Sequence, residues 1–327
     1  MELQIAASST KNNSISLKDS ISTSKPFIEA NTIDTSFEEV KHHHIIPVFI
    51  KDNEPLISHS DFIETVSDVA SDIFTGESIL KPNIRLSHPI KGRIPEAKNK
   101  AANDLLEHEK TIYYERMAFV IEIPTIQDEI DGQVLSLSIG GVKAYNQDNL
   151  YNKKGGDEHF KMFIGFQNKV CTNLCVWSDG YMGEVRVSSV GQLKATVKTL
   201  FTNYNSNFHL HSMKQLTGFY LTEQQFALLV GRSRMYPYLP NGIKTEIAQL
   251  SLGENQLSTV VKDYYKDESF CKMDDGSINL WRLYNLFTGA NKSSYIDNFL
   301  ERSVNAFNFT DQLRLALKNE NYSWFLS

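Results

Sequence analysis

The chain lacks the features that define several large classes of protein. Only three of its 327 residues are cysteine, an odd number without paired spacing, which argues against a disulfide scaffold and fits a reducing cytoplasm. The sequence contains no apolar run of about 18 residues and no signal-peptide pattern, so we expect neither a membrane span nor export. With 41% hydrophobic residues, we expect a cytoplasmic protein with a large core.

The common catalytic signatures are also missing. The sequence has no Gly-x-Ser-x-Gly motif, no phosphate-binding Gly-x4-Gly-Lys-Ser/Thr loop and no Gly-x-Gly-x-x-Gly dinucleotide fingerprint. Enzymes without such motifs exist, but the sequence favours a non-enzymatic protein without a cofactor.

An excess of positive charge is absent as well. Thirty-nine acidic residues against thirty-three basic ones give a net charge of -6. This balance argues against a protein that wraps nucleic acid over a large area, so DNA contacts would have to come from local basic patches.

The centre of the chain reads as sheet followed by helix. Residues 160–166 alternate apolar and other side chains, and residues 170–177 and 181–188 continue as strands around a turn at Asp179-Gly180. Two earlier strands are predicted over 117–123 and 135–139. After residue 189 the apolar period becomes helical, with a serine available as the cap.

The second half of the chain is predicted to be mostly helical. Thr222 and Gln225 have the spacing of a capping box, and a weaker helix covers 255–265. Residues 278–287 are apolar almost all round, which predicts a buried helix that Gly289 ends. Two further helices are predicted over 294–307 and 310–318. The fold class is therefore α+β, with a central antiparallel sheet of about five strands and a mostly helical C-terminal half.

The N-terminal region has the composition of a flexible tail. Fifteen of the first thirty-seven residues are Ser, Thr or Asn, so we predict a disordered tail over 1–40. The remainder, 41–327, is predicted to be a single α+β domain that divides, if at all, near residue 205 into sheet-rich 41–204 and helical 205–327. Within it, 44–50 is predicted as an edge strand, 82–97 as a basic loop and 96–109 as a charged helix.

Several clusters of reactive side chains have simpler structural interpretations. Cys171 and Cys175 are four residues apart on a predicted strand, about 13 Å, which is too far for one metal ion or one disulfide. The histidine groups lack further ligands at fixed spacing and are predicted to be surface or turn residues, while the acidic groups coincide with a strand start and a turn, so no metal site is predicted. These groups are His42-His43-His44, His209-x-His211, Asp157-Glu158-His159 and Asp274-Asp275.

Two stretches combine basic and other polar or aromatic residues, one within 85–93 and one within 231–240. Guanidinium groups pair with phosphates and tyrosine rings stack on unpaired bases, so together the stretches would suit a groove for single-stranded DNA. The alternative is that the second stretch holds solvated charges at a helix end. The predicted nucleic-acid contacts are Arg85, His88, Lys91, Arg93, Arg232, Arg234 and Tyr236, with Tyr238 beside them.

Three segments give the chain a family resemblance: IRLSHPIKGRIPEA, the run from LSIGGVKAYNQ to CVWSDGY, and INLWRLYNLFTGANKSSYIDNFLERSVNAF. From about Ile45 to its end the chain resembles the family known as domain of unknown function 3871, which occurs largely in Bacteroidota and often on mobile elements. The resemblance supplies no catalytic residue and no substrate. Together with the order of strands followed by a helix, which is loosely compatible with annealing proteins, it implies an accessory protein of a mobile genetic element, and the basic stretches would let that protein contact single-stranded DNA. The alternative is a non-enzymatic protein-binding module, such as an antirestriction or host-interacting factor, whose partner is a host protein.

Overall fold

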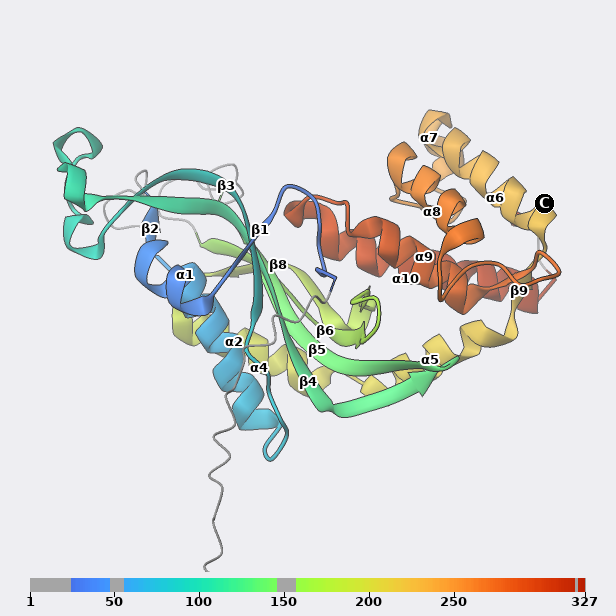
Figure 1. The fold of residues 1–327 in the computed structure, drawn as a ribbon, viewed down its shortest axis with the longest axis horizontal. Coiled ribbons are helices and arrows are strands. Elements are labelled where there is room, and N and C mark those ends of the chain that lie inside the picture. Colours follow the sequence, from blue (N-terminus) through green and yellow to red (C-terminus); the bar gives the residue numbers. More distant parts are fainter. Residues whose placement is uncertain (1–24, 48–55, 146–156, 321–322, 327) are drawn as a thin grey trace, which may run out of the picture.

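A large antiparallel sheet is the centre of the structure (Figure 1). The computed structural model describes residues 25–47, 56–145, 157–320 and 323–326. Within these ranges the chain is α+β, as the sequence predicts, but the sheet has eight strands instead of about five. Its strands are β1 (Ile33–Thr35), β2 (Ile46–Pro47), β3 (Asn83–Arg93), β4 (Lys110–Ile130), β5 (Gln133–Ala144), β6 (Glu158–Asn168), β7 (Leu174–Cys175) and β8 (Tyr181–Val187).

The order of the strands follows the chain through the middle of the sheet. The path is β1-β3-β4-β5-β6-β7, with β2 also on β3 and β8 also on β6, and all pairs are antiparallel. β4 and β5 meet at Asp131 and Gly132, whose φ angles of 51° and 75° suit a tight hairpin turn. The predicted turn at Asp179-Gly180 also exists, but β8 returns along β6 and not along the 170–177 segment.

The helices divide between the two faces of the sheet (Figure 1). α2 (His59–Ile73) and α4 (Val190–Asn203) pack on the face that carries Phe119, Ile121 and Ile139, while α10 (Ile296–Lys318) lies on the opposite face. The other helices are α1 (Phe37–His43), α5 (Ser206–Gln215), α6 (Glu223–Met235), α7 (Asn241–Lys244), α8 (Glu254–Lys266) and α9 (Leu280–Asn291). A small sheet joins β9 (Tyr220–Leu221) to β10 (Ile278–Asn279).

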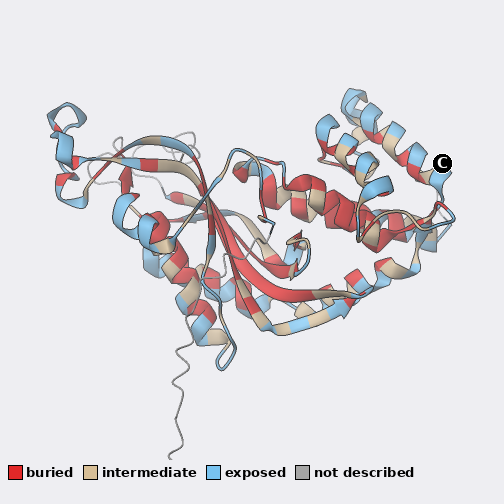
Figure 2. Cartoon of the chain, in the orientation of Figure 1, coloured by how far each residue is buried: buried red, intermediate tan, exposed pale blue. Residues whose placement is uncertain are grey.

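α9 is the predicted buried helix, and it lies at the centre of the helical half (Figure 2). Asn279 caps it by accepting a hydrogen bond from the backbone N–H of Arg282. The expectation that Gly289 ends this helix is wrong, because α9 continues to Asn291. The predicted cap Thr222 of α6 is confirmed, and the predicted serine cap of α4 is Ser189.

Four local predictions differ from the structure. The basic loop over 82–97 is largely strand β3, which tolerates Pro89 because β1 and β2 pair with only its two ends. Segment 96–109 forms short 3-10 turns, since Arg93 draws the carbonyls of Ala97, Lys98 and Lys100 toward its own guanidinium. The two last helices are one helix, α10, and regular structure begins at β1, ahead of residue 40. The predicted edge strand over 44–50 is described only as far as β2.

No helix in the described ranges combines the length and apolar character that crossing a membrane requires.

Two buried histidines make the fold sensitive to acid. Burial lowers the pKa of both His59 and His209 to about 3. The unfolded chain takes up these protons near pH 6.5, so between about pH 6.5 and 3 the unfolded state binds more protons, and stability falls as pH falls. We expect unfolding free energy to drop by about 1.4 kcal/mol per histidine between pH 7.5 and 5.5.

Urea unfolding at the two pH values measures this loss. The variant His59→Gln keeps a donor for the carbonyl of Tyr114, which His59 Nε2 contacts at 2.7 Å, but removes one titrating group. The variant should therefore lose about 1.4 kcal/mol less between the two pH values than the parent chain does. An identical pH dependence in both proteins would contradict the assignment.

Candidate functional site

A polar pocket lies on the sheet face that α10 covers only in part. It has a volume of 510 Å³ and lies over the start of β3, the middle of β4 and the end of β6. The apolar cluster between this face and α10 includes Val120, which also lines the pocket, so the pocket begins where the helix contact ends. Its lining residues are Leu80, Lys81, Asn83, Val120, Glu122, Pro124, Ser136, Gln167, Asn168, Lys169 and Thr172.

The charged groups of the pocket are two lysines and one carboxylate. Lys81 and Lys169 are exposed, and Lys81 forms no ion pair with any described residue. Lys169 Nζ lies 3.9 Å from Glu122 Oε1 and donates to Gln127 Oε1 at 3.3 Å. Glu122 Oε1 also accepts the hydroxyl of Ser136 at 2.7 Å. The Glu122 carboxylate therefore already has partners in Lys169 and Ser136. Because two lysines face one carboxylate, the pocket has a net positive charge.

Asn168 lines the pocket and carries a buried hydrogen-bond donor without a partner among the described residues. Its side chain is completely buried, and Oδ1 accepts from the backbone N–H groups of Val170 at 2.9 Å and Cys171 at 3.4 Å. Nδ2 has no partner among the described residues. Because a buried amide donor without an acceptor costs about 1–3 kcal/mol, its place in a pocket wall favours a ligand that offers an acceptor.

The loop after β6 is held in one conformation. Thr172 has a φ of 56°, its N–H donates to the carbonyl of Asn168 at 2.9 Å, and its Oγ1 donates to the carbonyl of Lys25 at 2.8 Å. Lys292, which precedes α10, donates to Thr172 Oγ1 at 2.8 Å and to the carbonyl of Cys171. Burial lowers the pKa of Lys292. The helical half therefore fixes the loop that presents Asn168 and Lys169.

The pocket has the chemistry of a binding site. Two ammonium groups and amide donors suit an anionic ligand that carries several acceptor oxygens. Its lining contains no cysteine or histidine, and the described residues contain no group of three side chains that could hold a metal ion.

The first group of sequence-predicted residues lies on β3. Arg85 is mostly buried and donates to Thr32 Oγ1 and to the Thr32 carbonyl, with Asp34 at 3.9 Å. Arg93 is 3% exposed and holds the carbonyls of the 97–100 turn. His88 has a φ of 59° and is skipped in the pairing of β3 with β4, and Lys91 is exposed.

The second group lies at the end of α6. Arg232 stacks over the ring of Trp324 and donates to its carbonyl. Arg234 Nε contacts Glu254 Oε1 at 2.9 Å and is close to half exposed. Tyr236 packs against Phe325 at a ring distance of 6.1 Å.

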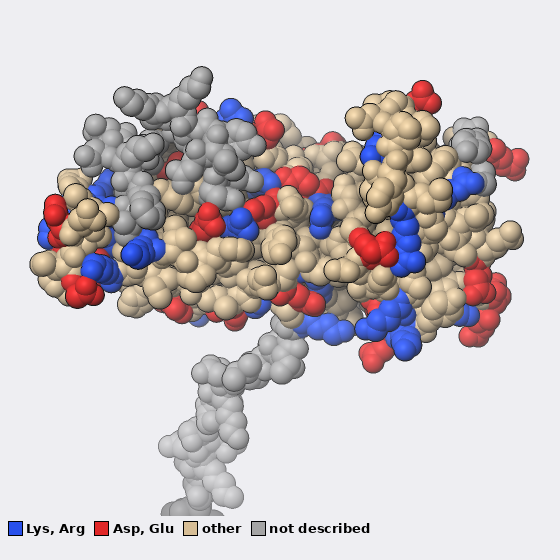
Figure 3. All heavy atoms as spheres, turned by 90° about the horizontal axis from the view of Figure 1, so that it is seen from above, with Lys and Arg blue, Asp and Glu red and all other residues tan. Residues whose placement is uncertain are grey.

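The two groups are not brought together. β3 and α6 lie toward opposite ends of the long axis of the molecule (Figure 1). Where described residues form the upper face, basic and acidic side chains are interspersed and no continuous basic stripe is visible (Figure 3). Lys81 and Asn83 lie directly before the first group in sequence, so the pocket adjoins the stretch that the sequence singles out. Asn168 and Lys169 have no comparable signal, because Asn168 is the last residue of β6 and Lys169 is an ordinary loop residue after it.

The cysteines, the histidine and the aspartate that the sequence singled out as reactive are explained by their places in the fold. Cys171 and Cys175 are free thiols, and burial raises the pKa of both. The expectation that His209 is a surface or turn residue is wrong, because it is fully buried and contacts the Tyr204 hydroxyl at 2.6 Å through Nδ1. Asp275 is a turn residue whose carboxylate accepts from Ser277, as the sequence predicts.

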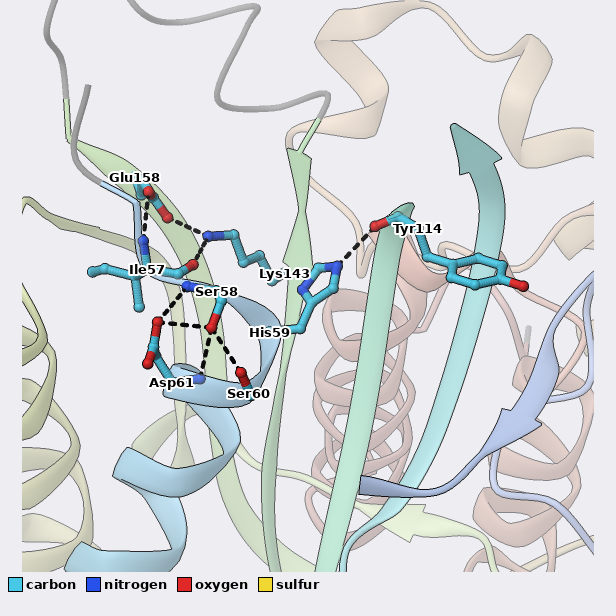
Figure 4. Close-up of polar contacts among 8 residues, drawn as sticks. All are labelled: Ile57, Ser58, His59, Ser60, Asp61, Tyr114, Lys143 and Glu158. Carbon is cyan, nitrogen blue, oxygen red and sulfur yellow. Dashed lines mark hydrogen bonds and ion pairs between the residues drawn. The ribbon is translucent and has the colours of Figure 1, made fainter. Parts of the chain in front are cut away.

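Glu158 belongs to a buried polar cluster at the start of α2 (Figure 4). Its carboxylate pairs with Lys143 Nζ and accepts the backbone N–H of Ile57 at 2.8 Å, while Lys143 also donates to the Ile57 carbonyl. Lys143 is 1% exposed and Glu158 6%. The cluster ties the chain before α2 to β5 and β6, and its burial separates it from solvent.

Removing one partner of this ion pair should be strongly destabilising. We expect Glu158→Gln to cost about 3–5 kcal/mol of unfolding free energy, because Lys143 would remain buried without a counter-charge. Urea unfolding of this variant, of Lys143→Met and of the double variant measures the coupling. The double variant should be more stable than Glu158→Gln alone, and the opposite order would contradict a paired charge.

The fold and the pocket together define an α+β protein with a polar pocket on its central sheet. The chain matches, over residues 9–326, the family described as a domain of unknown function with a B. Theta gene description (DUF3871). The protein therefore belongs to this family, as the resemblance implies, and the family description points to Bacteroidota. Comparison with curated proteins and with solved structures finds no match.

Proposed function

We propose that this protein binds single-stranded DNA without catalysing a reaction on it, and that part of the strand enters the polar pocket. The observation that carries the proposal is the combination of two exposed lysines with the unpartnered amide donor of Asn168 in one pocket. Phosphate oxygens suit the ammonium groups, and acceptors on a base or sugar suit the amide. The finer role, as an accessory protein of a mobile genetic element, rests on the family resemblance.

The size and charge of the pocket support a local contact. A volume of 510 Å³ falls in the range of sites for small ligands, so the pocket suits about one nucleotide. The overall charge of -6 and the mixed surface in Figure 3 disfavour a long electrostatic track. An unpaired strand is favoured over a duplex because its bases and backbone can enter a concave site separately.

Some of the sequence-predicted contacts remain part of the proposal. Lys91 and Arg234 are exposed, and in this proposal they contact phosphates of a strand long enough to extend beyond the pocket. Arg93 and Arg232 act mainly through their internal hydrogen bonds.

The double variant Lys81→Ala/Lys169→Ala tests the pocket. Fluorescence anisotropy with a labelled oligonucleotide should show about tenfold weaker binding at low salt, since two exposed ion pairs of roughly 0.7 kcal/mol each are lost. The slope of log K against log salt should become shallower by about 1.4, which corresponds to two phosphates on a single strand.

A matched control is Lys198→Ala, which removes an exposed lysine from α4 on the opposite side of the sheet. It should bind like the parent chain. No salt-sensitive binding by the parent chain at micromolar concentration would refute the function. Equal effects of the control and the double variant would refute the site.

Protein binding is the second candidate, and the end of α6 favours it. Three large apolar side chains are exposed within nine residues there: Met235 at 58%, Tyr238 at 88% and Ile243 at 42%. Large exposed apolar groups that lie close together are typical of interaction sites.

The variant Met235→Glu/Tyr238→Glu tests this candidate. A host protein that co-purifies in stoichiometric amount with the parent chain should be lost from the variant and retained by Val190→Glu. Val190 is a suitable control because it is 43% exposed and begins α4, where an acidic residue is tolerated. Failure to recover any stoichiometric partner, or its retention by the double variant, would count against this surface.

A further inference from the structure

Arg302 of α10 lies in a second pocket, distinct from the polar pocket on the sheet. The second pocket has a volume of 420 Å³ and is lined by Ala30, Asn31, Gly253, Glu254, Asn255, Gln256, Ser293, Ser294, Tyr295 and Arg302. It lies where the start of α8 meets the segment that leads into α10. Its only basic side chain is Arg302.

Arg302 has no acidic partner among the described residues, unlike Arg234 and Arg314 of the same helical half. Arg234 contacts Glu254 at 2.9 Å, and Arg314 contacts Asp311 at 2.6 Å. In the described part of the chain, Arg302 forms no ion pair, and its hydrogen bonds go to neutral oxygens only. Burial lowers its pKa. A partly dehydrated cation without a counter-charge is stabilised by an anion from outside the chain.

A buried hydrogen-bond network fixes the position of the guanidinium group. Nη1 donates to Gln256 Oε1 at 3.1 Å and to Ser294 Oγ at 2.9 Å. Gln256 Nε2 donates to Ser294 Oγ at 2.8 Å, and Ser294 Oγ donates to Asn291 Oδ1 at 2.7 Å. These three neutral side chains are 5%, 2% and 0% exposed. The guanidinium is therefore held before any ligand arrives, so binding loses little side-chain entropy.

The remaining donors of Arg302 are available to a ligand. A guanidinium has five N–H donors, and the bonds within the described residues use Nη1 only. Nε and Nη2 can therefore form the two parallel bonds with which arginine binds oxyanions. The carboxylate of Glu254, which also lines the pocket, is paired with Arg234. The first turn of α8 adds a favourable dipole at the rim.

We propose that this second pocket binds a phosphate-type oxyanion through Arg302. The anion is either inorganic phosphate or a phosphodiester of a nucleic-acid strand, which share the same oxygen chemistry. This site does not depend on Lys81, Lys169 or the DNA binding proposed above.

The test follows the Nε–Hε signal of Arg302 by NMR while inorganic phosphate is added at constant ionic strength. The signal is assigned from its absence in Arg302→Gln. It should shift and saturate in the parent chain. Asn255→Asp, which places a carboxylate in the pocket, should weaken the affinity about tenfold. Asn255 is the second residue of α8, where an acidic side chain favours the helix, so this variant should fold normally.

Asn207→Asp is the matched control, because Asn207 is exposed and is likewise the second residue of a helix, α5. Its phosphate affinity should equal that of the parent chain. A second titration uses a short single-stranded oligonucleotide in the parent chain and in Lys81→Ala/Lys169→Ala. If the Arg302 signal saturates at a lower concentration of oligonucleotide than of phosphate, the ligand is the phosphodiester. If the signal shifts with phosphate but not with the oligonucleotide, the ligand is the small anion. Absence of a saturable shift with both probes, or an unchanged affinity in Asn255→Asp, would overturn the proposal.

Discussion

The docking of α10 on the sheet depends on charges that neither element can leave unpaired. Lys161 on β6 pairs with Glu301 and donates to the carbonyl of Asp297, and Arg116 on β4 contacts the Asp297 carboxylate at 3.1 Å. Burial and the neighbouring Glu301 raise the pKa of Tyr181, which packs in the same contact. Because Lys161 is 8% exposed, loss of Glu301 from the docked helix would leave a buried cation without its counter-charge. Both pockets depend on this contact, since one is bounded by the loop that Lys292 holds and the other is built from the start of α10.

The regular elements of the sheet and the caps of the helices were predictable from local sequence. The alternating residues of β4, β5 and β6 and the capping residues Ser189 and Thr222 encode structure within a few positions. Segments whose structure depends on distant partners were not predictable from local sequence. β3 pairs with β4 despite Pro89, and the 94–109 segment is shaped by the guanidinium of Arg93. Phe27 and Ile28 are buried against α10, which no pattern in the N-terminal region indicates.

In the candidate sites, too, some features are visible in the local sequence and others depend on how the chain packs. The sequence identifies basic residues, but it does not show which of them already form hydrogen bonds within the protein. Arg93 and Arg232 both donate to carbonyls of the same chain. Lys81 and Asn83 adjoin a stretch that the sequence singles out, whereas Asn168 and Arg302 become notable only through a missing partner. An unpaired donor is a property of the packed structure, because it depends on what the rest of the chain does not supply.

The burial of Phe27 and Ile28 against Phe299 and Leu300 also sets the order in which the chain can fold. β3, β4, β5 and β6 are neighbours both in sequence and in the sheet, so pairing of consecutive strands can assemble them early. The opposite sheet face stays uncovered until α10 has been synthesised, about 270 residues after Phe27. During synthesis, Phe27 and Ile28 therefore stay unpacked until α10 is available. Until then one face of the sheet is exposed, and this is the state most prone to aggregation or to binding by a chaperone.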